Sequence, residues 1–169
     1  MTDRASRLVF RGTVEYRHEA NPKLDQPGVA VLVSRGVNRS LAMACPDGCG
    51  EQLTINLDKR SGPSWRYYGT ESGITLFPSV WRDTGCKSHF IIWRSRIYWC
   101  DLGDELESVD SHLLNAVREK LPRNFIRYVD LADQMGLEPW AVLSACVALC
   151  RRQAAVRGKA RAADQFRSL

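Results

Sequence analysis

The spacing of hydrophobic and polar positions changes near residue 102 of the 169-residue chain. Before that point, short segments rich in β-branched and aromatic residues alternate with turns that contain Gly, Pro, Asp and Asn. Such segments at intervals of about 8–12 residues predict an antiparallel sheet, sandwich or open barrel. The predicted strands are residues 7–17, 28–34, 40–45, 52–57, 65–69, 73–78, 88–94 and 96–100.

After residue 102 the apolar positions have helical spacing, with a capping residue or a Pro or Gly at most boundaries. The predicted helices span residues 111–121, 128–135 and 139–153, and the Ala- and Arg-rich remainder is predicted to continue as a frayed helix. We therefore predict an α+β chain. A small β-rich domain in residues 1–102 precedes a helical segment in residues 103–169 that ends in a basic tail.

The two later helices carry the spacing of a helix-turn-helix, with Ala132, Gly136 four residues later and Val142 six after that. A DNA-reading helix needs polar side chains for base edges, whereas residues 140–150 are apolar on nearly every face. The pattern predicts a winged-helix-like or three-helix packing unit rather than a sequence-specific DNA reader.

The charge of the chain is concentrated at its end. The net charge is +5, and residues 151–169 hold six basic side chains against Asp164 alone, so residues 1–150 are balanced. This distribution argues against nucleic acid as a partner, apart from weak phosphate attraction to the tail. No apolar run is long enough to span a bilayer, and the first residues lack the apolar region of a secretory signal. The predicted location is the cytoplasm, without a membrane partner.

Cysteines provide the most informative chemistry. Cys45 and Cys49 bracket a Pro-Asp-Gly turn, which is the shape of a zinc knuckle. Cys86 precedes one predicted strand and Cys100 ends the next, so a hairpin could complete a four-thiolate structural zinc site. His89 is an alternative ligand, and buried free thiols are the alternative interpretation. Cys146 and Cys150, one turn apart on an apolar helix, are predicted to pack in a core.

A histidine near two serines suggests acyl transfer. Ser88 and His89 are adjacent on a predicted strand, so their side chains point to opposite faces. Ser79 becomes the better partner if its strand pairs with that of His89 in a register that places the two opposite each other. Glu51 or Asp83 could orient the imidazole. The alternative is a sheet histidine that is hydrogen-bonded or bound to the metal.

Nine aromatic residues fall between positions 65 and 99, with arginines among them. Such a set could stack single-stranded nucleic acid or hold an extended peptide in a groove. Aromatic residues are also what a small sheet uses for its core and its cross-strand pairs, and this is the favoured interpretation.

Three motifs together resemble one bacterial protein family. They are the cysteine-glycine knuckle Cys45…Cys49-Gly50, the step Pro78-Ser79-Val80, and the step Cys86-Lys87-Ser88-His89-Phe90. The chain is similar over residues 27–100 to small zinc-type proteins encoded beside genes for bacterial E1-, E2- and ubiquitin-like proteins. Some members of that family lack a cysteine at the position of Cys100, which sets Cys100 apart from the other three.

This resemblance implies a serine-type peptidase that acts on the C-terminal tail of a ubiquitin-like protein. Its nucleophile would be Ser79, or in second place Ser88, with His89 as base, Glu51 as orienting acid, zinc in a structural role and the aromatic sheet edge holding the tail. The alternative is a non-enzymatic zinc adaptor that recruits E1- or E2-like proteins, as an E3-like scaffold would. A third interpretation is a metal-dependent hydrolase that uses His89. The sequence does not specify the substrate or the oligomeric state.

Overall fold

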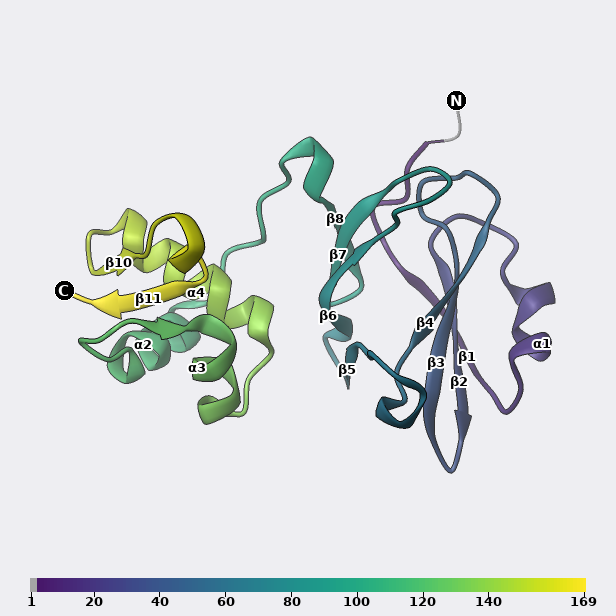
Figure 1. The fold of residues 1–169 in the computed structure, drawn as a ribbon, viewed down its shortest axis with the longest axis horizontal. Coiled ribbons are helices and arrows are strands. Elements are labelled where there is room, and N and C mark those ends of the chain that lie inside the picture. Colours follow the sequence, from purple (N-terminus) through teal and green to yellow (C-terminus); the bar gives the residue numbers. More distant parts are fainter. Residues whose placement is uncertain (1–2) are drawn as a thin grey trace. The chain divides into compact units, whose positions relative to one another are not determined.

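A computed structural model describes residues 3–169 (Figure 1). The chain divides into two compact units, one ending at Asp104 and the other spanning Glu105–Leu169. Three sheets and four α-helices make up the described residues, so the predicted α+β class is confirmed.

The first unit contains two four-stranded sheets. One sheet has the order β1-β2-β3-β4 and the other the order β5-β6-β7-β8. The strands are β1 (Val9–Val14), β2 (Val29–Arg35), β3 (Val37–Ala44), β4 (Gln52–Asn56), β5 (Arg66–Thr70), β6 (Gly73–Trp81), β7 (His89–Trp93) and β8 (Arg96–Trp99). Short helical turns lie between and after them: α1 (Arg17–Ala20), η1 (Asn21–Lys23), η2 (Lys59–Ser61) and η3 (Cys100–Leu102).

Both sheets contribute to one apolar core. Leu41 and Met43 of β3 belong to the same buried cluster as Phe90 and Ile92 of β7. Strand β2 is apolar at every position from Val29 to Val33 because both of its faces are covered. Its even-numbered residues enter the core between the sheets, and its odd-numbered residues pack with Ala20 and Leu24 of the α1–η1 segment. This alternation accounts for the continuous run seen in the sequence.

The predicted antiparallel pairing fails at one position. Strands β2, β3 and β4 pair antiparallel, as do β5 to β8, but β1 pairs parallel to β2. A parallel neighbour requires a crossover connection rather than a tight turn. Residues 15–28, which contain α1 and η1, form that connection. The sequence-based prediction missed this crossover because it extended the first strand to residue 17.

The second unit combines three helices with a small sheet. The helices are α2 (Ser111–Lys120), α3 (Tyr128–Met135) and α4 (Pro139–Arg151), and the strands β9 (Ile126–Arg127), β10 (Ala155–Arg157) and β11 (Gln165–Ser168) form a sheet of order β10-β11-β9. The Asp110 carboxylate caps α2 by accepting from Leu113 N–H. Gly136 ends α3 in a left-handed conformation. The order helix, strand, helix, helix, strand, strand is that of a winged helix.

Helix α4, which would be the reading helix of a DNA-binding member of this class, is mostly buried. Val142, Ala145 and Cys146 lie in the core of the unit, and Cys150 packs against its margin. Burial raises the pKa of the Cys146 thiol to about 12. The helix therefore serves the packing of its own unit, as its apolar sequence indicates.

The predicted frayed helical tail is wrong. Helix α4 ends at Arg151, and the following chain forms β10, the turn η4 (Ala160–Ala162) and β11. Phe166 is fully buried in the core of the unit, and the guanidinium of Arg157 lies 5.4 Å from the centre of its ring. Because β11 pairs with both β10 and β9, the basic residues belong to a folded hairpin and not to a free arm.

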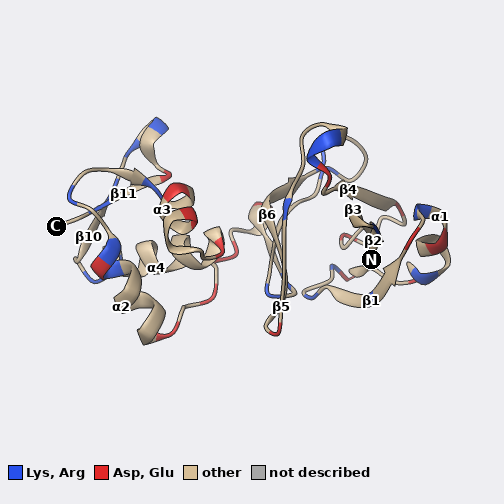
Figure 2. Cartoon of the chain, turned by 90° about the horizontal axis from the view of Figure 1, so that it is seen from below, with Lys and Arg blue, Asp and Glu red and all other residues tan. Residues whose placement is uncertain are grey.

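Basic and acidic residues are interspersed along this unit (Figure 2). Arg127 pairs with Asp164 at 2.9 Å, and Arg151 pairs with Glu105 at 2.7 Å. In the part of the chain that the structure describes, no helix has the length and apolarity needed to cross a membrane.

The burial of Phe166 predicts that this side chain contributes to the free energy of unfolding. Phe166→Ala should lower the free energy of unfolding by about 3–5 kcal/mol, because it leaves a cavity in the core. The exposed Arg161→Ala should change it by less than about 0.5 kcal/mol. Urea unfolding of the full chain measures both. Equal, small effects of the two substitutions would mean that the C-terminal residues are not part of the folded core.

Candidate functional site

Cys45 and Cys49 lie on a tight turn between two strands. Cys45 follows directly after β3, and its N–H donates to the carbonyl of Glu51 at 2.8 Å. Gly48 N–H donates to the carbonyl of Cys45 at 3.1 Å. Gly48 and Gly50 have φ values of 83° and 85°, which are unfavourable for other residues. The turn therefore holds its two thiols at the end of the sheet, as the sequence indicates.

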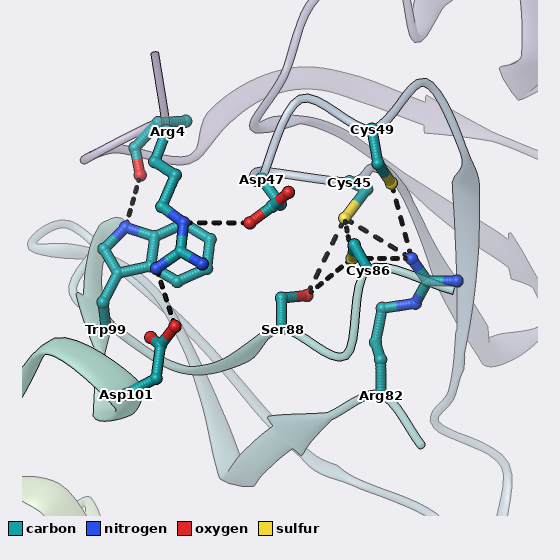
Figure 3. Close-up of polar contacts among 10 residues, drawn as sticks. Arg4, Cys45, Asp47, Cys49, Arg82, Cys86, Ser88, Trp99 and Asp101 are labelled. Carbon is teal, nitrogen blue, oxygen red and sulfur yellow. Dashed lines mark hydrogen bonds and ion pairs between the residues drawn. The ribbon is translucent and has the colours of Figure 1, made fainter. Parts of the chain in front are cut away.

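Cys86 reaches the same place from the loop between β6 and β7. Its Sγ lies 3.7 Å from the Sγ of Cys45, and the sulfurs of Cys45, Cys49 and Cys86 all lie within 4.8 Å of one another (Figure 3). Sulfurs around a tetrahedral zinc ion, each about 2.3 Å from the metal, are about 3.8 Å apart. The three cysteines, called here the thiol cluster, could therefore hold a metal ion.

Arg82 faces the thiol cluster. Its Nη1 lies 3.0 Å from the sulfur of Cys86, 3.5 Å from that of Cys49 and 3.7 Å from that of Cys45 (Figure 3). Its other guanidinium nitrogen forms an ion pair with Glu51. The guanidinium therefore places a positive charge within 3.7 Å of all three sulfurs.

Ser88 is the other polar neighbour of the cluster. Its side chain is buried, and its Oγ lies 3.3 Å from the sulfur of Cys86 and 3.9 Å from that of Cys45. Burial raises the pKa of the Cys86 thiol, but hydrogen bonds with Ser88 and the other two thiols outweigh burial and lower it to about 7. Burial raises the pKa of Cys45 to about 11. Cys86 is therefore more readily ionised than Cys45.

The N-terminal segment contacts the turn that carries Cys45 and Cys49. Arg4 pairs with Asp47 in the turn at 2.9 Å and with Asp101 at 2.8 Å, and its guanidinium lies 4.4 Å from the centre of the Trp99 ring (Figure 3). Ala5 N–H donates to the carbonyl of Pro46 at 2.8 Å. Charge and stacking together connect the turn to the end of β8.

Cys100 and His89 lie outside the thiol cluster. The register of β7 with β8 ends at the pair Phe90–Trp99, and Cys100 then begins the turn η3. The hairpin therefore does not bring Cys100 to the metal-binding position, contrary to the four-thiolate expectation. His89 is directed elsewhere because it begins a strand whose next residue, Phe90, points into the core.

His89 meets Ser79 on the outer face of the sheet. The Nε2 atom of His89 lies 2.9 Å from the Oγ of Ser79. The expected register was wrong, since His89 pairs across the strands with Trp81 and the ladder shifts between Leu76 and Val80. Ser79 is two residues from Trp81 on the same face, so it reaches the imidazole diagonally.

No carboxylate within residues 3–169 hydrogen-bonds to the His89 ring. Glu51, the expected orienting acid, is instead paired with Arg82 at the thiol cluster. The aromatic neighbour of the imidazole is Trp81, whose ring centre lies 5.8 Å away at an angle of 31°. The geometry is that of a serine–histidine pair beside a tryptophan rather than of a triad.

The sequence reading missed the roles of Arg82, Arg4 and Trp81. Arg82 lies four residues before Cys86, and the two side chains meet because the loop between β6 and β7 folds back on itself. Arg4 is 43 residues from Asp47 in the chain, and no local pattern connects them. Trp81 was grouped with the core aromatics, yet its side chain is exposed.

The thiol cluster predicts which cysteines retain a metal. Cys45→Ser, Cys49→Ser and Cys86→Ser should each lower the metal content from about one ion per chain to a small fraction, since a structural site needs its full set of ligands. Cys100→Ser is the matched control and should keep the wild-type content. Elemental mass spectrometry of the purified variants gives the count. Metal loss in Cys100→Ser equal to that in Cys86→Ser would contradict the geometry.

Comparison of the chain with curated proteins and with solved structures gives no match. A family model described as "Bacterial ubiquitination-like system serine protease (BubE)" matches residues 16–100, half of the chain. The matched region contains the thiol cluster and the Ser79–His89 pair, and it confirms the family that the sequence motifs predicted. The chain therefore belongs to the BubE family of serine proteases of bacterial ubiquitination-like systems.

Proposed function

We propose that Ser79 and His89 are the catalytic residues and that the substrate is the C-terminal tail of a ubiquitin-like protein, free as a precursor or joined to a target. The observation that carries the assignment is the 2.9 Å contact between Ser79 Oγ and His89 Nε2. A serine hydroxyl within hydrogen-bonding distance of an imidazole is the usual arrangement of an activated nucleophile. Membership of a serine protease family supports it.

The reaction follows from the chemistry of this pair. His89, with its own proton on Nδ1, accepts the hydroxyl proton of Ser79 on Nε2 as the oxygen attacks the carbonyl carbon of the scissile bond. The imidazolium then gives that proton to the leaving group, and an acyl group remains on Ser79. Water, deprotonated by His89, releases the acyl group and restores the serine. The neighbours of the ring are the hydroxyl of Ser79 and the indole of Trp81.

Ser88, the second choice as nucleophile, fits a different role. It is almost fully buried against the sulfurs of Cys45 and Cys86, where a substrate carbonyl has no access. Adjacent strand residues point to opposite faces, which separates Ser88 from the imidazole of His89. Ser88 therefore supports the thiol cluster, and Ser79 remains the nucleophile of the proposal.

The thiol cluster would hold a structural zinc ion through Cys45, Cys49 and Cys86. Three sulfur donors at these separations suit zinc. Bound there, the ion would fasten the turn between β3 and β4 to the loop between β6 and β7. That loop joins the strand of Ser79 to the strand of His89, so the thiol cluster would position the catalytic pair without touching the substrate. Conjugation proteins of the E1 and E2 classes are the further partners that the family context favours.

Cleavage kinetics test the catalytic assignment. Ser79→Ala and His89→Ala should each lower kcat by roughly 10³-fold or more on a fusion of the cognate ubiquitin-like protein to a reporter, because each removes one half of the activated nucleophile. Ser88→Ala, at the neighbouring serine, should retain Ser79-dependent cleavage. If Ser79→Ala and His89→Ala cleave as fast as the wild type, the assignment of these two residues fails. If the wild type itself does not cleave the fusion, the adaptor interpretation gains support.

A further inference from the structure

Strand β6 is longer than its neighbour β5, so β5 pairs with only part of one edge of β6. β5 pairs with β6 from Gly73 to Phe77, where Arg66 is the last partner. β6 continues to Trp81, and there it pairs with β7 alone. Among the described residues 3–169, no strand therefore pairs with this edge of the segment 78–81, which carries Ser79.

The hydrogen-bonding pattern gives the direction of the backbone groups at this edge. Arg82 N–H donates to the carbonyl of Ser88 at 2.9 Å, which makes Arg82 and Ser88 a hydrogen-bonded pair. In an antiparallel ladder such pairs alternate, so Trp81 and His89 form a non-hydrogen-bonded pair. The N–H and C=O of Trp81 consequently point away from β7, toward the side where β5 has ended. The indole N–H of Trp65 donates a hydrogen bond to the Ser79 carbonyl at 3.3 Å.

The side chain of Trp81 is equally accessible. It is 71% exposed, more than any other large hydrophobic side chain in the part of the chain described. It lies on the face that carries Ser79, with its ring against that of His89. An exposed indole beside a reactive pair offers a large apolar contact surface that does little for the stability of the free protein.

We propose that Trp81 is the substrate-positioning residue of this site: an extended segment of the substrate polypeptide adds as a strand to the free edge at Trp81, and one of its apolar side chains packs on the indole. The proposal rests on the catalytic assignment of Ser79 and His89 and names the residue that positions their substrate. The occupant is an unfolded polypeptide segment, because strand addition needs backbone N–H and C=O groups that are free of other partners. Continuity of the edge with Ser79 places that segment beside the nucleophile.

A comparison of long and short substrates tests this proposal. The long probe is a heptapeptide coumarin amide with the C-terminal sequence of the cognate ubiquitin-like protein, and the short probe is the acetylated single-residue coumarin amide. Trp81→Ala should lower the ratio of their kcat/KM values, long over short, by about tenfold, mainly through the KM of the heptapeptide. Trp81→Phe should restore most of the ratio. Phe10→Ala, at an exposed aromatic of the other sheet, is the matched control and should leave the ratio unchanged.

Backbone substitution tests the strand itself. N-methylation of the heptapeptide at successive positions should raise KM at every second residue near the scissile bond, because strand pairing uses alternate N–H groups. A ratio that is unchanged in Trp81→Ala, or N-methylation without effect at any position, would overturn the proposal while cleavage still depends on Ser79. If Ser79→Ala cleaves both probes at the wild-type rate, the catalytic assignment fails first, and the two failures remain distinguishable.

Discussion

The register of β6 against β7 is the constraint on which the site depends. Val80 pairs with Phe90, and both side chains are buried in the core between the sheets. This burial directs their neighbours outward, so Trp81 and His89 share the outer face with Ser79. A slip of one residue would place His89 in the core and expose Phe90, at a large cost in hydrophobic burial. The packing of the core therefore fixes the geometry of the serine–histidine pair.

The same hairpin connects this pair to the thiol cluster. The loop from Arg82 to Ser88 is closed by the hydrogen bond between their backbone groups, and it carries Cys86 to the knuckle formed by Cys45 and Cys49. Ser88 lies with the sulfurs while His89, the next residue, lies with Ser79. The proposed zinc site and the proposed catalytic pair thus involve consecutive residues. They remain separate because consecutive strand side chains point to opposite faces of the sheet.

Local patterns in the sequence predicted what depends on neighbours in the chain. The apolar run of β2, the knuckle at Cys45 and the capped helix α2 all follow from spacing within about ten residues. Contacts between distant segments were not predictable in this way. The exclusion of Cys100 depends on the pairing of Phe90 with Trp99, and the C-terminal strands depend on β9, about 40 residues away. Phe166 was the one aromatic residue in the tail, and the surrounding Arg and Ala residues favoured a helix.

Mapping of a covalent adduct tests the central claim most directly. The chain, purified without chelators, is treated with a fluorophosphonate, and the modified residue is identified by peptide mass spectrometry. The account predicts one adduct per chain, on Ser79, and the loss of that adduct when His89 is replaced by alanine. An adduct on Ser88, or labelling of Ser79 that is indifferent to His89, would contradict it.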